Sequence, residues 1–213
     1  MHPRIYKEFE RLLDQHPPPG KDVLELGAPP KRTSLLTAVL QRDPTAHCVG
    51  INIKIGRKDP SLPYEMVKGN ANNLSMFGDQ SFDAVLTNSM LEHDQAFWLT
   101  LAEVRRVLKP GGLFYAGVPA YRNAETTSQR MISRLRRSRL RDGAVAGPFL
   151  ARLSGSRLMS TPTFMFHSAP HDYWRFSEQA VREVFFEGMD CLALSQVLSP
   201  IRIVAVGSKR APA

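Results

Sequence analysis

The chain has 213 residues, which is enough to bury one full-sized core, so a single domain over residues 1–213 is expected. A composition of 43% hydrophobic and 23% charged residues excludes a disordered chain, and no apolar run approaches the roughly 18–20 residues that cross a bilayer. The net charge of +8 leaves an anionic partner open, although six arginines lie between Arg130 and Arg141.

The cysteines indicate a reducing compartment. Cys48 and Cys191 both fall in apolar segments that we expect to be strands, so buried thiols are favoured over a disulfide. The N-terminal residues lead directly into charged positions rather than into the apolar stretch of a signal peptide. A cytoplasmic location is therefore expected.

The first half of the chain alternates between the two kinds of periodicity. Pro3–Gln15 has apolar residues on one helical face and forms most of an N-terminal segment, residues 1–20. Leu35 begins a second helical pattern, with Thr33 or Ser34 as the N-cap. The strands predicted around these helices are Val23–Gly27, Cys48–Ile53, Glu65–Lys68 and Phe82–Thr87.

A third helical pattern runs from Phe97 to Leu108 and is predicted to stop at the turn Lys109–Gly112. Leu113–Val118 follows as a strand. The pattern then lapses and resumes with Ser177 as an N-cap, Val181, Val184 and Phe185 on one helix face, and Gly188 as the stop. Two last strands, Cys191–Val197 and Ile201–Gly207, are close enough in sequence to form an antiparallel hairpin.

Alternation of this kind predicts an α/β fold: a doubly wound, mostly parallel, seven-stranded Rossmann-like sheet with an antiparallel C-terminal hairpin. Residues 121–165 form an insertion after the fifth strand. Within it Arg130, Arg134, Arg137 and Arg141 share one helical face. Such a face can bind RNA phosphates, an anionic lipid surface or an acidic substrate, or belong to a solvated lid, and the lid is the favoured interpretation.

Five segments, in this order, resemble the motifs of class I S-adenosylmethionine-dependent methyltransferases, specifically those of the type 11-like group. The resemblance covers Val23 to Gly207 and implies the methyltransferase variant of the predicted fold. The five segments are Val23–Gly27, Cys48–Asn52, Lys68–Leu74, Ser81–Val85 with Asn88–His93, and Leu108–Gly112.

The resemblance also implies a cofactor, S-adenosylmethionine, and a set of residues around it. Asn52 stands at the ribose position and Asn70 beside the adenine, whereas the family usually has acidic residues at both. Neutral amides accept weaker hydrogen bonds, so a non-catalytic cofactor-binding relative stays open. The implied cofactor-binding residues are Glu25, Gly27, Ala28, Asn52, Asn70, Ala71, Asn88, Ser89 and His93.

The loop after the first strand departs from the family pattern as well. Ala28-Pro29-Pro30-Lys31 replaces the usual further glycines. The pyrophosphate of a dinucleotide needs closely approaching backbone amides, so this loop argues against a nicotinamide dehydrogenase.

The acceptor side of the site is expected in two places, after the fourth strand and in the segment Phe166–Phe176. Transfer to a hydroxyl requires a proton acceptor, and histidine is the most common one. His171 is the first candidate, His167 the second and Asp94 the third. Asp94 is also a candidate ligand for Mg²⁺. Tyr173, Trp174 and Arg175 are the candidate substrate-binding residues.

The function predicted from the sequence is O-methylation of a small hydroxylated metabolite, with a sugar hydroxyl favoured as acceptor. The alternatives are an RNA or other nucleic-acid methyltransferase that uses the basic insertion, which is not favoured, and the non-catalytic relative. The sequence leaves open the identity of the acceptor, the need for a metal, and whether the chain forms a homodimer.

Overall fold

The computed structural model describes residues 1–56, 60–121, 134, 171–198 and 200–211. Met1–Tyr121 and Ala169–Ala213 form one compact unit, to which the following description applies. Three expectations lie outside the described residues: His167, the lid between residues 122 and 165 apart from position 134, and the helical face shared by Arg130, Arg137 and Arg141.

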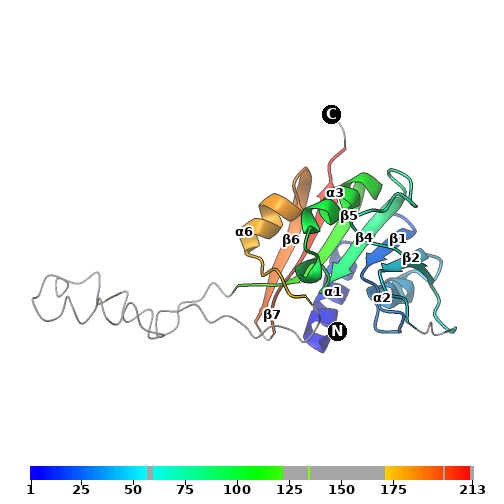
Figure 1. Ribbon diagram of the computed structural model, residues 1–213, viewed down its shortest axis with the longest axis horizontal. Helices are drawn as coiled ribbons and strands as arrows, with labels where there is room; N and C mark the ends of the chain where they lie inside the picture. The colour runs from blue at the N-terminus through cyan, green and yellow to red at the C-terminus, as the bar shows by residue number, and fades with distance from the viewer. Residues whose placement is uncertain (57–59, 122–133, 135–170, 199, 212–213) are drawn as a thin grey trace, which may run out of the picture. The chain divides into compact units, whose positions relative to one another are not determined.

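A seven-stranded sheet in the order β3-β2-β1-β4-β5-β7-β6 forms the centre of this unit (Figure 1). The first five strands run parallel, and β7 pairs antiparallel with both β5 and β6. The predicted doubly wound sheet with an antiparallel C-terminal hairpin is thereby confirmed. The strands are β1 (Asp22–Leu26), β2 (His47–Asn52), β3 (Glu65–Lys68), β4 (Phe82–Asn88), β5 (Leu108–Pro119), β6 (Met189–Leu198) and β7 (Ile201–Lys209).

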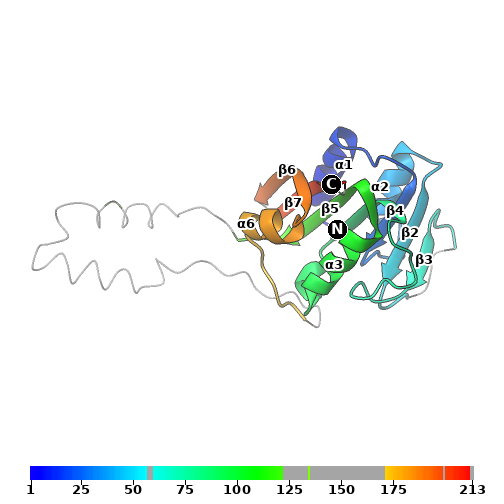
Figure 2. The same ribbon diagram turned by 90° about the horizontal axis from the view of Figure 1, so that it is seen from above.

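Helices cover both faces of the sheet, as the view from above shows (Figure 2). On one face, α1 (Pro3–Gln15) buries Ile5 and Phe9 beside α2 (Leu35–Arg42), whose N-cap is Ser34. The other face carries α3 (Phe97–Val107), together with α6 (Glu178–Ala180) and the π-helical turn Val181–Phe185 that continues it. Each face therefore has its own apolar core, as expected for a buried parallel sheet.

Two local expectations were wrong. The turn predicted at Lys109–Gly112 is part of β5, where Gly111 takes a positive φ of 76° and the pairing with β4 is irregular. Val184 was expected in the core but is 43% exposed. The π-helical turn explains this, because its wider spacing brings Phe185 and Phe186 inward together and turns Val184 outward.

Both cysteines are free thiols; Cys48 is buried and Cys191 half-buried. Among the described residues, no helix has both the length and the apolar character needed to span a membrane.

Candidate functional site

A cavity of about 470 Å³ opens where β1, β2 and β4 end. This is the carboxyl edge of the sheet, at the point where the strand order reverses between β1 and β4, and ligands of doubly wound sheets bind at such points. The volume falls in the range of small-molecule sites. The lining residues are Gly27, Ile51, Asn52, Ile53, Gly69, Asn70, Ala71, Asn72, Ser89, Met90, His93, Asp94, Gln95, Ala96 and Tyr173.

Gly27 lines the cavity, and no other residue type fits its place. Its φ is +72°, and a Cβ there would lie 2.7 Å from Met90 Cγ. Ala28 is fully buried, and its backbone N–H donates to the carbonyl of Ile51 at 3.1 Å. At Gly27 the backbone therefore forms the cavity wall directly, without a side chain, whereas Ala28, which was expected at the cofactor, lies outside the lining.

Glu25, also expected at the cofactor, lies outside the cavity lining. Only 2% of it is exposed, and one carboxyl oxygen accepts hydrogen bonds from the Ser34 hydroxyl and, at 3.3 Å, from the backbone N–H of Leu36. Strand alternation points Glu25 to the same face as Val23, toward the start of α2. Burial raises the pKa of the Glu25 carboxyl to about 7.

Asn52 stands at the end of β2 and reaches across to the loop after β1. Its Nδ2 donates to the carbonyl of Ala28 at 3.0 Å, and its Oδ1 accepts the N–H of Lys54 at 3.3 Å. Oδ1 has a second lone pair, so the side chain keeps an acceptor for a ligand hydroxyl in the cavity.

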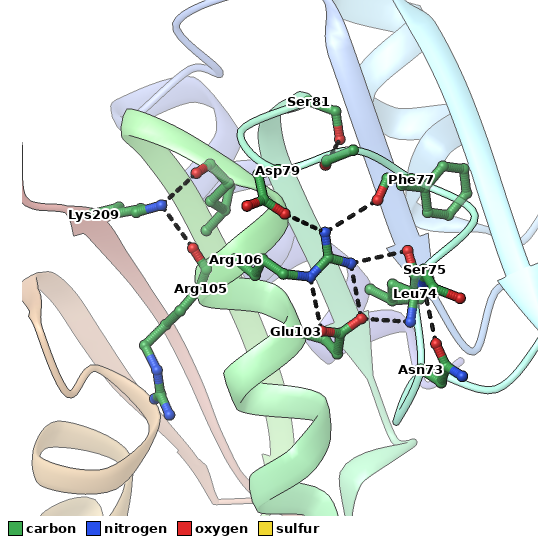
Figure 3. Close-up of polar contacts among 12 residues, drawn as sticks. Asn73, Leu74, Ser75, Phe77, Asp79, Ser81, Glu103, Arg105, Arg106 and Lys209 are labelled. Carbon is green, nitrogen blue, oxygen red and sulfur yellow. Dashed lines mark hydrogen bonds and ion pairs between the residues drawn. The ribbon is translucent and has the colours of Figure 1, made fainter.

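The loop after β3 forms a second wall through Gly69, Asn70, Ala71 and Asn72. Asn70 Oδ1 accepts the N–H of Asn72 at 3.0 Å, which fixes the turn. The residues that follow are attached to α3 by Arg106, which donates to the carbonyls of Leu74 at 3.0 Å and Phe77 at 3.1 Å (Figure 3).

Arg106 also holds both carboxyl oxygens of Glu103, at 2.8 and 2.9 Å, and Asp79 at 2.7 Å (Figure 3). Glu103 in turn accepts the N–H of Leu74 at 2.5 Å. The hydrogen bonds from Arg106 lower the pKa of the Glu103 carboxyl. This network anchors the chain that leaves the cavity wall.

Two residues at the end of β4 were expected at the cavity, and only Ser89 lines it. Ser89 lines the cavity with a φ of +55°, an unusual value for a residue with a side chain. Asn88 does not line it. The Oδ1 atom of Asn88 is buried without a hydrogen-bond partner. It lies beside Gly117, where an added Cβ would come within 2.6 Å of it. Asn88 is on the same face of β4 as Leu86, which points toward α1.

The segment His171–Phe176 reaches the cavity through Tyr173, which is 45% exposed and lines it. The N–H of Tyr173 donates to the carbonyl of Glu92 at 2.8 Å, within the 3₁₀ turn η1 (Leu91–His93). His171 is exposed, stacks on Tyr173 at 5.6 Å between ring centroids, and does not line the cavity. His93 does line it, and its Nδ1 is hydrogen-bonded to the carbonyl of His171.

The other expected acceptor-side residues have structural partners. Asp94 lines the cavity, but both of its carboxyl oxygens accept hydrogen bonds from neighbouring groups. Arg175 forms a bidentate ion pair with Asp172, and Trp174 packs on Phe97 at 5.4 Å. Within the part of the chain that the structure describes, no three His, Cys, Asp or Glu side chains cluster as metal ligands would, so the Mg²⁺ expectation at Asp94 gains no support.

Several lining residues were not predicted, among them Asn72, Met90 and Gln95. Each is a sequence neighbour of a predicted one. Asn72 was recognisable, because the second asparagine in the run Asn70-Ala71-Asn72-Asn73 has the same capacity to hydrogen-bond as the first. Met90 carries no such signal, since its place depends on the close approach to Gly27.

Comparison with known proteins relates part of this chain to a methyltransferase domain. Residues 28–116 match the model of a methyltransferase domain. An uncharacterized 37.1 kDa protein in transposon TN4556 of Streptomyces fradiae is 29% identical over 157 residues, which are 68% of this chain. The match spans 45% of that protein, so this chain corresponds to about half its length.

Two solved structures share the fold. The 1,6-didemethyltoxoflavin-N1-methyltransferase of Burkholderia thailandensis, solved with S-adenosylhomocysteine, has a TM-score of 0.64 at 16% identity, over 97% of this chain and 78% of that one. The [4+2]-cyclase SpnF has a TM-score of 0.61 at 13% identity, over 97% and 81%. Residues 28–116 therefore match a methyltransferase domain, and the seven-stranded sheet that contains them has the fold of these two solved structures.

Proposed function

We propose that this protein transfers a methyl group from S-adenosylmethionine to a hydroxyl of a small metabolite. The observation that carries the proposal is the cavity itself. It lies at the switch point of the sheet, and the described residues that were expected at the cofactor or the acceptor supply much of its lining.

The cofactor half of the cavity fits an adenosyl ligand. The bare backbone at Gly27 lets a ligand approach β1 closely, and Asn52 offers an acceptor oxygen to ribose hydroxyls. Ala71 and its neighbours would face the adenine. Bound here, S-adenosylmethionine supplies a methyl carbon activated by the sulfonium.

The acceptor half lies toward η1 and Tyr173. Two imidazoles lie on this side: His93 is in the wall, and His171 is outside the lining but stacked on Tyr173. We infer that one of them takes the proton of the acceptor hydroxyl. The Tyr173 ring offers a flat, half-exposed surface that suits a sugar or an aromatic acceptor. The sugar hydroxyl remains our favoured acceptor.

Titration calorimetry with S-adenosylmethionine and S-adenosylhomocysteine tests the cofactor half. Saturable binding of both is expected, and Gly27→Trp should abolish it by filling the cavity. Because Gly27 has a positive φ, Ala71→Trp serves as a second cavity-filling variant without that strain. Gly78→Trp is the matched control, because a Cβ at Gly78 meets no atom within 4 Å.

The acceptor half is tested by screening the purified protein with methyl-labelled S-adenosylmethionine against sugars, phenols and RNA. Labelled sugar or another labelled small hydroxylated compound supports the proposal. Absence of binding of either cofactor form at millimolar concentration contradicts it, and labelling of RNA alone would assign the protein to the alternative class.

A further inference from the structure

Asp94 lies between η1 and α3, in the wall of the cavity. One carboxyl oxygen accepts hydrogen bonds from Asn72 Nδ2 at 2.8 Å and from the Thr100 hydroxyl at 2.7 Å. The other accepts the N–H of Ala96 at 3.0 Å, at the start of α3. Three donors thus converge on this carboxylate and fix its position in the wall.

The same residue reaches the opposite side of the cavity through its backbone. The carbonyl of Asp94 accepts the indole N–H of Trp174 at 2.9 Å. Trp174 and Tyr173 both donate their backbone N–H groups to the carbonyl of Glu92, at 3.3 and 2.8 Å. Asp94 therefore bonds to the cofactor-side loop through Asn72, and to the segment that carries Tyr173 through Trp174.

The chemistry at this position requires a carboxylate. An amide at position 94 would turn an NH₂ group toward one of the three donors and leave two donors facing each other. Thr100 is fully buried, so water cannot readily replace a lost bond there.

We propose that Asp94 is a positioning residue that couples the two walls of the cavity. A ligand seated against Gly69–Asn72 restricts the Asn72 side chain, and Asp94 passes that restriction to Trp174 and so to Tyr173. Cofactor binding thereby orders the acceptor-side wall before the acceptor arrives. The proposal rests on the proposed function, because it takes the adenosyl ligand to occupy this cavity.

Hydrogen exchange with and without S-adenosylhomocysteine tests the coupling. In the wild type, the ligand should slow amide exchange both at residues 70–74 and at residues 171–176. Asp94→Ala removes the link to Asn72, and Trp174→Phe removes the link to the Asp94 carbonyl while keeping an aromatic ring beside Phe97. In each variant, S-adenosylhomocysteine should still slow amide exchange at residues 70–74 but should no longer slow it at residues 171–176.

A double-mutant cycle provides a second readout that a general loss of stability would not reproduce. Asp94→Asn should weaken S-adenosylhomocysteine about tenfold by calorimetry, because the new NH₂ group faces either Asn72 Nδ2 or the N–H of Ala96. Adding Asn72→Ala removes the donor of Asn72, together with its bonds to the Ala96 carbonyl and the Thr100 hydroxyl, so the double variant should lose clearly less affinity than the two single losses sum to. Asp190→Ala, which removes only an exposed ion pair with Arg210, is the control and should behave as the wild type.

The results separate this proposal from the one it rests on. If the wild type does not bind S-adenosylhomocysteine, the proposed function falls and the coupling with it. If the ligand binds but residues 171–176 respond equally in the wild type, Asp94→Ala and Trp174→Phe, or respond in none of them, only the coupling is overturned.

Discussion

Ser89 combines backbone strain with a place in the cavity wall. Its φ of +55° costs a residue with a side chain roughly 1–2 kcal/mol relative to ordinary regions. Strained residues concentrate at functional sites, where the side chain serves a purpose that glycine could not. Ser89 is a candidate for such a role, since the residue is part of the cavity lining.

Substitution at Ser89 should therefore separate strain from binding. Ser89→Gly should raise the free energy of unfolding by up to about 1 kcal/mol, the relief being partly offset by the greater freedom of glycine in the unfolded chain. It should also weaken S-adenosylhomocysteine, whereas Ser89→Ala should weaken it without the gain in stability. Chemical denaturation and calorimetry measure the two effects.

Gln80 supplies the matched control for this prediction. It has a similar φ of +51° but is exposed and lies outside the cavity lining. Gln80→Gly should gain stability and leave the affinity unchanged. Equal affinity in Ser89→Gly and the wild type would show that the hydroxyl makes no contact with the ligand.

At the scale of elements, α3 determines where the loop after β3 lies. Arg106 holds two carbonyls of the loop and the carboxylates of Glu103 and Asp79, and in Figure 3 its side chain points toward the loop, whereas that of Arg105 points away. A lysine offers one ammonium in place of this planar fork and cannot make the same bonds.

Arg106→Lys should lower the free energy of unfolding by about 2 kcal/mol and reduce S-adenosylhomocysteine affinity several-fold, because the loop that leaves the cavity wall loses its anchor. Arg105→Lys is the control on the same helix, since the Arg105 side chain contacts Val184 and Glu187 rather than the loop after β3. Similar losses in both variants, measured by urea denaturation and calorimetry, would contradict a specific role for Arg106.

At the scale of the whole molecule, the buried Glu25 should make stability depend on pH. Its folded-state pKa of about 7 lies above the ordinary 4.5, so its contribution to stability is fully present below pH 4.5 and is lost as the pH rises through 7. A shift of this size corresponds to roughly 3 kcal/mol. Glu25→Gln removes this titration.

Relative to the wild type, Glu25→Gln should therefore gain stability progressively between pH 5 and pH 8 in urea denaturation. The difference in free energy of unfolding between the two proteins reports on Glu25 alone, because the remaining groups titrate in both. Glu65→Gln, at an exposed position of β3, should run parallel to the wild type. If the stability of Glu25→Gln runs parallel to that of the wild type across this pH range, the folded-state pKa of Glu25 lies near its ordinary value.

The sequence predicted the sheet and much of the cavity, and its errors have local causes. Gly27, Asn52 and Asn70 line the cavity because they lie at or after the ends of strands whose carboxyl ends meet there, and their contact with the cofactor stays a prediction. Asn88 was assigned to the cavity from its place after β4, although alternation from Leu86 already pointed it toward α1. The exposure of Val184 was not predictable from helical periodicity, because that periodicity assumes an α-helix and the chain takes a π-helical turn.

The hydrogen bonds of the Asp94 carboxylate could not be predicted from the sequence either. Its carboxylate receives donors from Asn72, Ala96 and Thr100, and the sequence gives no measure of the distance between the loop of Asn72 and α3. The same holds for His93 and His171, which are far apart in sequence and meet only because His171–Phe176 lies along η1.

Ala120 pairs with Phe176, and the N–H of Tyr121 donates to the carbonyl of Phe176. The chain therefore leaves the sheet and returns to it at the same point. Strands β1 to β5 precede this point in the chain, and β6 and β7 follow it. The entropy of closing a loop grows only slowly with its length, so the sheet places little demand on how many residues pass between. We therefore expect the sheet to keep its strand order when residues are inserted or removed between these two points.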